Sequence, residues 1–465
     1  MYAAMACFAL MTGLSACIPA DPETAETDLP GIQISPRYPQ YWTYDGKPSL
    51  LLGGSVEDNL FQIDSLDDHL DLLQSVGGNY VRNTMSSRDS GNVWPFLLKE
   101  NGKYDLSAWN DEYWRRFEHF LQATASRDIV VQIEVWATFD FYREPWLNNP
   151  FNPKNNDNYT VERSQLPTEV PTHPVFHQND FFRSVPTQIS SPIVLGFQQR
   201  FVDKLLSYSL QHDHLLYCMD NETSVNADWG RFWANYIRQV AREQGKDVHT
   251  TEMWDPWDLG HVLHRETFDH PEIYTFVDIS QNNHQTGDNH WNNGLAQIER
   301  LKRTGKLRPL NNVKIYGNDG GPHKTTRDGI ESFCRSVLFG AASARFHRPT
   351  SGQGLNAHAQ ALIRSMRTLT DEMPFFEAAP HNDLLADRAE NEAFCRALPG
   401  SAYLLYFPDG GQVKLNLTDA PGQFELRWMD LLQSTWSESQ VQQGGAEVEL
   451  VCPGKGHWAA ILLKK

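Results

Sequence analysis

The octapeptide LLYCMDNE, residues 215–222, joins five consecutive apolar side chains to three polar ones. An apolar run of this length predicts a strand that is buried on both faces, as in a parallel sheet. Helical patterns with one apolar face precede this run at residues 197–210 and follow it at residues 229–243. A strand between two such helices predicts a βαβ unit.

The same alternation extends from residue 50 over most of the chain. Further strands are predicted over residues 49–53, 80–82, 129–136, 248–253, 274–279, 313–316 and 344–347. Helical patterns between and after them include residues 295–302, 330–342 and 357–366. Eight strand–helix units in order favour a closed (β/α)8 TIM barrel. No Gly-rich nucleotide-binding motif follows an early strand to favour an open doubly wound sheet.

Past about residue 385 the pattern changes to strands without helices between them. Residues 402–407 and 413–417, separated by Asp409-Gly410-Gly411, predict a hairpin. Further strands are predicted over residues 424–428, 446–451 and 458–463. We therefore expect an α/β barrel over 31–383 followed by a small antiparallel β-sandwich domain over 384–465. Support of the barrel is the favoured role for this second domain, and carbohydrate binding is the alternative.

Residues 1–30 predict a signal segment and a tether. Leu14-Ser15-Ala16-Cys17 follows a run of apolar or small residues and resembles a bacterial lipobox, in which Cys17 becomes the lipidated first residue. A tether rich in Pro, Asp, Glu and Thr comes next. This predicts an exported, membrane-anchored lipoprotein of the bacterial cell envelope, periplasmic or on the surface. No Lys or Arg precedes the apolar run, which leaves a buried N-terminal helix as the alternative.

Composition narrows the function further. The chain has 465 residues and a formal net charge of -18, without the basic cluster that binding to a nucleic acid requires. The later cysteines show no CxxC spacing, so neither a structural zinc site nor any other cofactor is expected. Aromatic residues make up 12% of the chain, and their flat faces suit stacking on sugar rings.

In a (β/α)8 barrel the working side chains lie at the carboxyl ends of the strands. Glu222 ends the fourth predicted strand, directly after Asn221, and Arg82 ends the second. Hydrolysis of a glycosidic bond needs two carboxyl groups, about 5–5.5 Å apart for retention and about 6.5–9.5 Å apart for inversion. The fourth and seventh strands lie on opposite sides of the mouth of such a barrel, where their ends face each other.

The Asn-Glu pair at the end of the fourth strand resembles clan A of the glycoside hydrolases. The resemblance implies that Glu222 is the general acid/base, that Asn221 contacts the sugar 2-hydroxyl, and that Arg82 lies near the nucleophile. Residues 32–60, the Asn-Glu strand and the terminal β-domain also resemble the apiosidase-like family of bacterial polysaccharide-degrading lipoproteins, which pairs such a barrel with a C-terminal β-domain.

The seventh strand departs from the clan A pattern. Clan A has a nucleophilic Glu there, whereas this chain offers Lys314, Tyr316, Asn318 and Asp319. Asp319 is the nearest carboxylate and is expected to act as nucleophile or base, although its surroundings are also typical of a turn. Glu252 and Glu134 are the alternatives for the second carboxylate.

Other polar and aromatic residues at strand ends are candidates for binding the substrate. Trp136 and Trp254 are expected to stack on sugar rings, with core packing as the alternative. Hydrogen bonds to hydroxyl groups are expected from Asn282, His284, Tyr316 and His347.

The sequence therefore predicts a secreted glycoside hydrolase that cleaves a plant or algal poly- or oligosaccharide. A glycan-binding lipoprotein whose barrel lacks catalysis is the main alternative, favoured by the missing Glu on the seventh strand. A polysaccharide lyase is a third hypothesis, and it would need a Tyr or His base beside a neutralised uronate.

Overall fold

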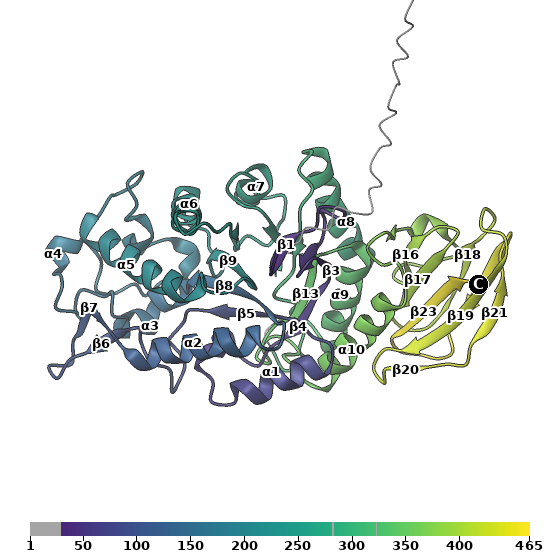
Figure 1. Cartoon of the computed structure of the whole chain (residues 1–465), viewed down its shortest axis with the longest axis horizontal. Coiled ribbons are helices and arrows are strands. Elements are labelled where there is room, and N and C mark those ends of the chain that lie inside the picture. Colours follow the sequence, from purple (N-terminus) through teal and green to yellow (C-terminus); the bar gives the residue numbers. More distant parts are fainter. Residues whose placement is uncertain (1–28, 281–282, 322) are drawn as a thin grey trace, which may run out of the picture.

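The computed structural model describes residues 29–280, 283–321 and 323–465 (Figure 1). The predicted signal segment, its Cys17 and the predicted ligand Asn282 lie outside the described residues. No helix within the described ranges combines the length and the apolar character that crossing a membrane requires.

A ring of parallel strands forms the barrel. In chain order the described strands of the ring are β4 (Leu51–Gly54), β5 (Tyr80–Thr84), β8 (Val130–Trp136), β9 (Leu215–Asp220), β10 (His249–Thr251), β11 (Val277–Asp278), β12 (Leu310–Asn311) and β13 (Ser343–Phe346). They pair in the order β10-β9-β8-β5-β4-β13, and β11 pairs with β12. The N–H of Ala342 donates to the Leu310 oxygen at 2.8 Å and joins β12 to β13, while the N–H of Thr250 donates to Thr275 Oγ1 at 3.1 Å across the remaining seam.

Each of these strands leads to a helix on the outside of the ring (Figure 1). The helices are α1 (Leu66–Ser75), α2 (Asp111–Ala125), α5 (Pro192–Ser209), α6 (Ala227–Glu243), α7 (Val262–Asp269), α8 (Gly287–Arg303), α9 (Thr326–Phe339) and α10 (Ala357–Asp371). The predicted (β/α)8 barrel is thereby confirmed. No helical pattern was predicted over α7, because its eight residues are too few for a clear apolar period.

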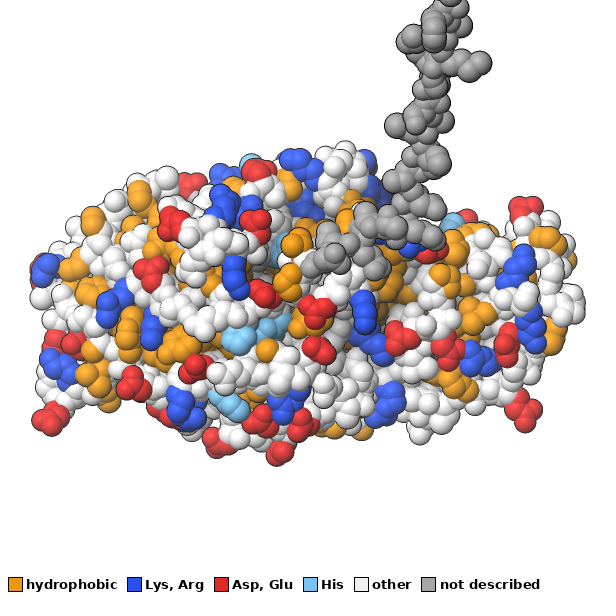
Figure 2. Space-filling model, viewed as in Figure 1, with side chains coloured by type: hydrophobic (Ala, Val, Ile, Leu, Met, Phe, Trp, Pro, Cys, Tyr) orange, Lys and Arg blue, Asp and Glu red, His pale blue; other side chains and the backbone are white. Residues whose placement is uncertain are grey.

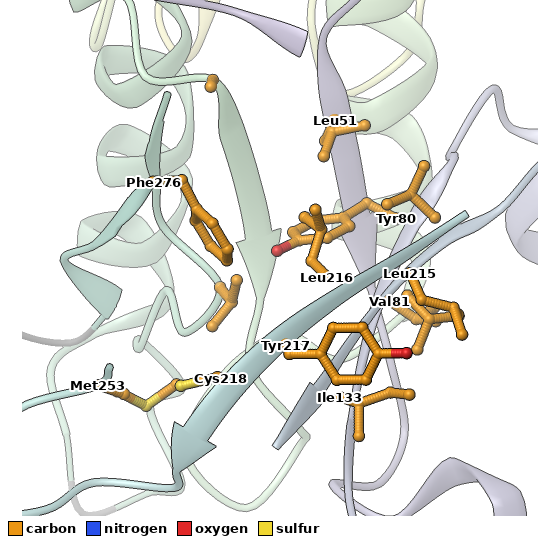
Figure 3. Packing of buried hydrophobic residues seen from close by; sticks show 14 of the residues in the cluster. Leu51, Tyr80, Val81, Ile133, Leu215, Leu216, Tyr217, Cys218, Met253 and Phe276 are labelled. Carbon is orange, nitrogen blue, oxygen red and sulfur yellow. The ribbon is translucent and has the colours of Figure 1, made fainter. Parts of the chain in front are cut away.

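Strand β9 shows why a continuous apolar run predicts burial on both faces. Tyr217 points outward to α5, where its hydroxyl donates to Ser209 Oγ at 2.9 Å. Its neighbours Leu216 and Cys218 point the other way, and all three side chains are buried. Figure 3 shows how they pack with side chains of β4, β5 and β8.

The seventh strand lies earlier in the chain than the predicted range 313–316. β12 ends at Asn311, and beyond it only Ile315 pairs, with Phe346 of β13. Lys314 and Tyr316 therefore lie past the end of the strand, at the mouth of the barrel. The apolar residues of this extended segment are buried, so the segment has the sequence pattern of a strand although it lacks the continuous backbone pairing of one.

An antiparallel sheet of short strands closes the opposite end of the barrel. It consists of β1 (Ile32–Ile34), β2 (Trp42–Tyr44) and β3 (Lys47–Ser49). Trp42 is fully buried and meets the rings of His249 and Phe276 edge-on. Its indole Nε1 donates to Asn311 Oδ1 at 3.0 Å. This side chain therefore fills the space beneath β10, β11 and β12.

Two long loops at the mouth carry additional elements. The loop between β5 and α2 contains the antiparallel pair β6 (Phe96–Leu98) and β7 (Tyr104–Trp109). The loop between β8 and α5 contains the short helices α3 (Arg143–Asn148) and α4 (Val161–Ser164).

The C-terminal strands form two antiparallel sheets beside α9 and α10 (Figure 1). One sheet contains β14 (Ala379–Pro380), β16 (Phe394–Leu398), β17 (Ala402–Phe407), β23 (Trp458–Lys464), β19 (Gln423–Asp430), β20 (Thr435–Trp436) and β21 (Gln440–Gln443). The other contains β15 (Leu385–Ala386), β18 (Gln412–Asn416) and β22 (Glu447–Val451).

The predicted hairpin of residues 402–407 and 413–417 is wrong. β17 pairs with β16 and β23, whereas β18 pairs with β15 and β22, so the Gly-rich link crosses from one sheet to the other. Tyr403, Leu405 and Phe407 of β17 pack between the two sheets. Leu404 and Tyr406 point the other way and join the core of the barrel. Because β17 is apolar on both faces, its sequence does not reveal which strand it pairs with.

Candidate functional site

Loops at the carboxyl ends of the barrel strands enclose a cleft of about 550 Å³. The loop between β8 and α5 forms one wall with apolar side chains, including Phe139, Tyr142 and Pro174. The charged and polar side chains that line the cleft come from the loops after β4, β5, β8, β9, β12 and β13; they include Asp58, Arg88, Arg143, Asn221, Glu222, Lys314, Tyr316, His323, His347 and Arg348.

Glu222 lies directly after β9, and 13% of its side chain is exposed. Its Oε1 accepts hydrogen bonds from Lys314 Nζ at 2.6 Å and from the Tyr316 hydroxyl at 3.0 Å. The φ angle of Glu222 is 57°, a left-handed conformation that is costly for a residue with a Cβ. Such strain persists only where the surrounding contacts hold the residue in place.

The charges around Glu222 keep its carboxyl group ionised. Burial alone raises the pKa of a carboxyl group, but the positive charge and hydrogen bond of Lys314, together with the charge of Arg82, outweigh it. The pKa of Glu222 therefore lies below its usual value, and at neutral pH the group is a carboxylate.

Asn221 is held by the same cations. Its Oδ1 accepts from Lys314 Nζ at 2.5 Å and from Arg82 Nη2 at 3.5 Å. Only 2% of Asn221 is exposed, so its side chain is fixed at the base of the cleft beside Glu222.

Asp58 is a second carboxylate of the cleft. Its Oδ1 lies 3.0 Å from Arg82 Nη1, and its Oδ2 lies 3.3 Å from Arg348 Nε and 3.7 Å from Arg88 Nη2. Burial opposes ionisation here too, but the charge of Arg82 and those of its neighbours hold the pKa of Asp58 well below its usual value. Arg82 in turn pairs with Glu134 at 2.9 Å and is fully buried, so it supports the site from beneath.

His347 lines the cleft next to this network. Its Nδ1 lies 3.4 Å from Arg82 Nη1 and 3.5 Å from Asp58 Oδ1. Burial lowers the pKa of His347 well below its usual value, against the opposing charge of Asp58. The imidazole is therefore neutral at physiological pH.

None of the three carboxylates considered as partners of Glu222 lines the cleft. Asp319 lies in the loop before α9, and its Oδ1 accepts from the N–H of Thr326, the first residue of that helix, at 2.9 Å, so the structure favours its interpretation as a structural residue. Glu134 is fully buried against Arg82. Glu252 is fully buried behind β9.

The expected stacking roles of Trp136 and Trp254 are wrong. Trp136 is 1% exposed and packs among aromatic rings that include Phe181, Phe201 and Trp233. Trp254 is fully buried next to Thr223, with which it forms an isolated parallel bridge. Both indoles are buried, and neither face is open to a sugar.

His284 lies outside the main cleft. It lines an adjoining recess of about 200 Å³ that shares Lys314, Tyr316 and His323 with the cleft. The side chain of His284 is exposed, and its backbone oxygen accepts a hydrogen bond from Lys324 Nζ. Tyr316 lines both cavities, so it connects them.

A buried pair of carboxyl groups supports β9 from behind. Glu252 Oε1 accepts from the N–H of Asp220 at 2.9 Å, and the indole of Trp229 donates to Asp220 Oδ1 at 3.2 Å. Burial raises the pKa of both Asp220 and Glu252, so one of the two is protonated and hydrogen-bonds to the other. This pair holds the backbone directly before Asn221 and Glu222.

Comparison with known proteins identifies the fold. No protein-family model matches the chain, and no curated protein matches it. A family 5 glycoside hydrolase from Bacteroides vulgatus shares 13% sequence identity over 93% of each chain, with a TM-score of 0.64. The chain therefore shares its fold with this family 5 glycoside hydrolase.

Two further structures have the same fold. A putative glycoside hydrolase from Bacteroides vulgatus shares 10% identity over 96% of this chain and 84% of its own, with a TM-score of 0.61. A family 30 subfamily 8 xylanase from Clostridium acetobutylicum shares 8% identity over 89% of this chain and 97% of its own, with a TM-score of 0.50. The likeness to clan A is thus shown for the fold, and the resemblance to the apiosidase-like family stays a prediction.

Several residues of the site were not predicted from the sequence. Asp58, Arg88, Arg143 and Arg348 line the cleft, and Lys314 forms the closest contact of Glu222. Asp58 and Arg348 follow the ends of the first and eighth strands, so the position rule for barrels could have found them. Arg143 lies within a long loop, where no such rule applies.

Proposed function

We propose that the chain is a glycoside hydrolase whose central catalytic group is Glu222. One observation carries this proposal: an ionised carboxylate at the end of the fourth barrel strand projects into a cleft and is held there by Lys314 and Tyr316. The fold of families 5 and 30 is consistent with it. The substrate class is a poly- or oligosaccharide of plant or algal origin.

The charge of Glu222 favours one role over another. A general acid needs a raised pKa so that it carries a proton at working pH. The pKa of Glu222 is lowered instead, so we assign it the role of nucleophile or base. This differs from the acid/base role that the clan A resemblance implies.

Asp255 does not line the cleft, but burial and the charge of Glu222 raise its pKa, and we propose it as the proton donor. The N–H of Asp255 donates to the Thr223 oxygen at 2.7 Å, so the residues that follow β9 and β10 run side by side. Burial and the negative charge of Glu222 raise the pKa of Asp255. Two neighbouring carboxyl groups whose pKa values are shifted in opposite directions are typical of an acid and base pair.

Export and the division into domains complete the proposal. A substrate outside the cell requires export, for which the segment before residue 30 and a lipid on Cys17 are proposed. Residues 31–383 are proposed as the catalytic domain and 384–465 as its supporting β-domain.

A binding protein without catalysis is the second candidate. It is favoured by Lys314, which lies where clan A has its nucleophilic glutamate and pairs with Glu222. In a pure binder the ion pair would be structural, and the cleft would hold a glycan without cleaving it.

The variant Glu222→Gln separates the two candidates. The parental protein is screened on plant and algal oligosaccharides, with proton NMR to follow the first anomer formed. Glu222→Gln is expected to bind the same glycan and to lose at least about 100-fold in turnover, the scale of acid–base or covalent catalysis. Asp319→Asn is the matched control and is expected to keep the parental rate, because Asp319 lies outside the cleft. Parental turnover by Glu222→Gln would reject the assignment.

A further inference from the structure

The wall of the cleft is richer in positive than in negative charge. Its lining contains two carboxylates, Asp58 and Glu222, and four basic residues, Arg88, Arg143, Lys314 and Arg348. The whole chain has the opposite balance, with 58 acidic against 40 basic residues. Over the face shown in Figure 2, acidic and basic side chains are interspersed. The cleft is therefore a local exception to the charge of the protein.

The exposed fractions of the charged side chains determine which charges a ligand in the cleft can contact. The side chain of Asp58 is only 5% exposed, whereas Arg88 and Arg348, which pair with it, are 14% and 23% exposed. Both guanidinium groups line the cleft together with Asp58, although Arg88 also pairs with Asp140 and Arg348 with Glu57, each at 3.2 Å. Because the two arginines are more exposed than Asp58, a ligand contacts more of their surface than of the Asp58 carboxylate.

Arg143 adds a guanidinium group that is not used within the protein. Among the described residues no carboxylate oxygen lies within 4.0 Å of its side chain, which is exposed and lines the cleft. Its φ angle is 55°, a left-handed conformation, and its N–H donates to the Val170 oxygen at 2.6 Å. The backbone is thus strained at the residue whose guanidinium group lines the cleft.

Carboxylates of the protein pair with Arg88, Arg348 and Lys314, but binding of a neutral sugar gives no account of the Arg143 guanidinium group. A hydroxyl group accepts one hydrogen bond from a guanidinium group as easily as from a neutral donor. A carboxylate or a sulfate group accepts two parallel hydrogen bonds from one guanidinium group, with charge in addition. Fixed arginines at the wall of a cleft are therefore matched to an anionic group.

We propose that the glycan bound in this cleft carries a carboxylate or sulfate group, which Arg143 binds together with Arg348 and Arg88. The anionic sugar is a uronic acid or a sulfated residue. That the glycan is cleaved rests on the proposed function, whereas that it binds does not. The inference deepens the proposed function by naming the substrate class.

The test uses the full-length Glu222→Gln variant, which binds without turnover if the proposed function is correct. Calorimetry compares a galacturonic acid oligosaccharide with its methyl ester, and a sulfated galactan oligosaccharide with its desulfated form. At least one charged ligand is expected to bind about tenfold more tightly than its neutral counterpart, a difference of about 1.4 kcal/mol. The pair that shows the difference identifies the anionic group.

A second variant assigns the preference to Arg143. Arg143→Met is expected to lose most of the preference for the charged ligand and to keep the affinity for the neutral one. Arg115→Met is the matched control, because Arg115 is an exposed arginine on α2 that pairs with Glu112 and does not line the cleft. Equal affinity for both members of each pair, or a preference that Arg143→Met retains, would overturn the inference.

The two proposals fail in different ways. Cleavage of neutral glycans alone by the parental protein supports the hydrolase and overturns the anionic substrate. Tight binding of a charged glycan without any cleavage supports the anionic ligand and rejects the hydrolase.

Discussion

The ammonium group of Lys314 lies 2.6 Å from the carboxylate of Glu222, and only 1% of the lysine side chain is exposed. Lys314 follows the seventh strand of the barrel, where the clan A resemblance implies a second glutamate. In this chain the position therefore carries a buried positive charge, which stabilises the ionised form of Glu222. This ion pair determines the proposed role of Glu222 and the pH range in which it acts.

Replacing Lys314 by methionine is expected to move the acidic limb of activity. The acidic limb reports the pKa of Glu222, because Glu222 must be ionised to act as nucleophile or base. In the parental protein this pKa lies below the ordinary value of 4.5. Without the lysine the pKa rises, so kcat/KM falls at a higher pH than in the parent. Lys154→Met is the control, because Lys154 is exposed and pairs with Glu169 outside the cleft. An unshifted limb in Lys314→Met would contradict the electrostatic argument.

Replacing Tyr316 by phenylalanine is expected to shift the acidic limb of activity in the same direction, but by fewer pH units. The variant loses one hydrogen bond to the Glu222 carboxylate, at 3.0 Å, while Lys314 and its charge remain. A hydrogen bond to a charged group contributes about 1.5–3 kcal/mol, which corresponds to a shift of the acidic limb of at most about 1–2 pH units. The pH profiles of the two variants are measured side by side. A larger shift for Tyr316→Phe than for Lys314→Met would contradict the expected ranking of the two contacts.

The buried pair Asp220 and Glu252 is expected to make stability depend on pH. Burial raises the pKa of Asp220 from 3.8 to about 7, so the folded state binds more protons than the unfolded state between those values. The contribution of Asp220 is present in full below about pH 4, and it is lost as pH rises to about 7. The free energy of unfolding falls by up to about 1.4 kcal/mol per pH unit for each proton involved.

Urea unfolding at a series of pH values checks this expectation. Glu252→Gln removes one titrating group, so its curve should be flatter than the parental one between about pH 4 and pH 7. Glu299→Gln, at an exposed position on α8, should keep the parental slope. Parallel curves for the parent and Glu252→Gln would show that the pair does not titrate in this range.

Truncation of Trp42 is expected to destabilise the protein. Trp42 fills the space beneath β10, β11 and β12 and is fully buried, so Trp42→Ala should cost about 3–5 kcal/mol in the free energy of unfolding. Trp257→Ala is the control, because 61% of Trp257 is exposed and its loss should cost less than about 0.5 kcal/mol. Urea unfolding of the two variants at one pH measures the difference.

The barrel could be predicted because its strands are short apolar runs between amphipathic helices, a pattern that depends on nearest neighbours along the chain. The seventh strand was misplaced because Val313 and Ile315 are as buried as β12 and give residues 313–316 the alternating pattern of a strand. The hairpin at β17 was wrongly predicted because a strand with two apolar faces gives no information about its partner. These errors concern pairing between segments, which local pattern does not contain.

The candidate site was predictable only in part. The strand-end rule identifies Asn221, Glu222, Arg82, Tyr316 and His347, which the structure brings together around the cleft or beneath it. The rule cannot show that Trp136 and Trp254 are buried, because indoles at strand ends have the same sequence signature whether exposed or buried. The charge state of Glu222 depends on Lys314, 92 positions further along the chain.

Strand β17 has one face in the barrel and the other between the two C-terminal sheets. Tyr406 packs with the helices of the barrel, and its neighbours Leu405 and Phe407 pack inside the sandwich. Removal of the terminal sheets would expose the apolar surface of α9 to water, so the two parts should melt in a single cooperative transition. The same shared strand would prevent recombination from replacing the terminal module by another unless the adjoining helix surface changed with it.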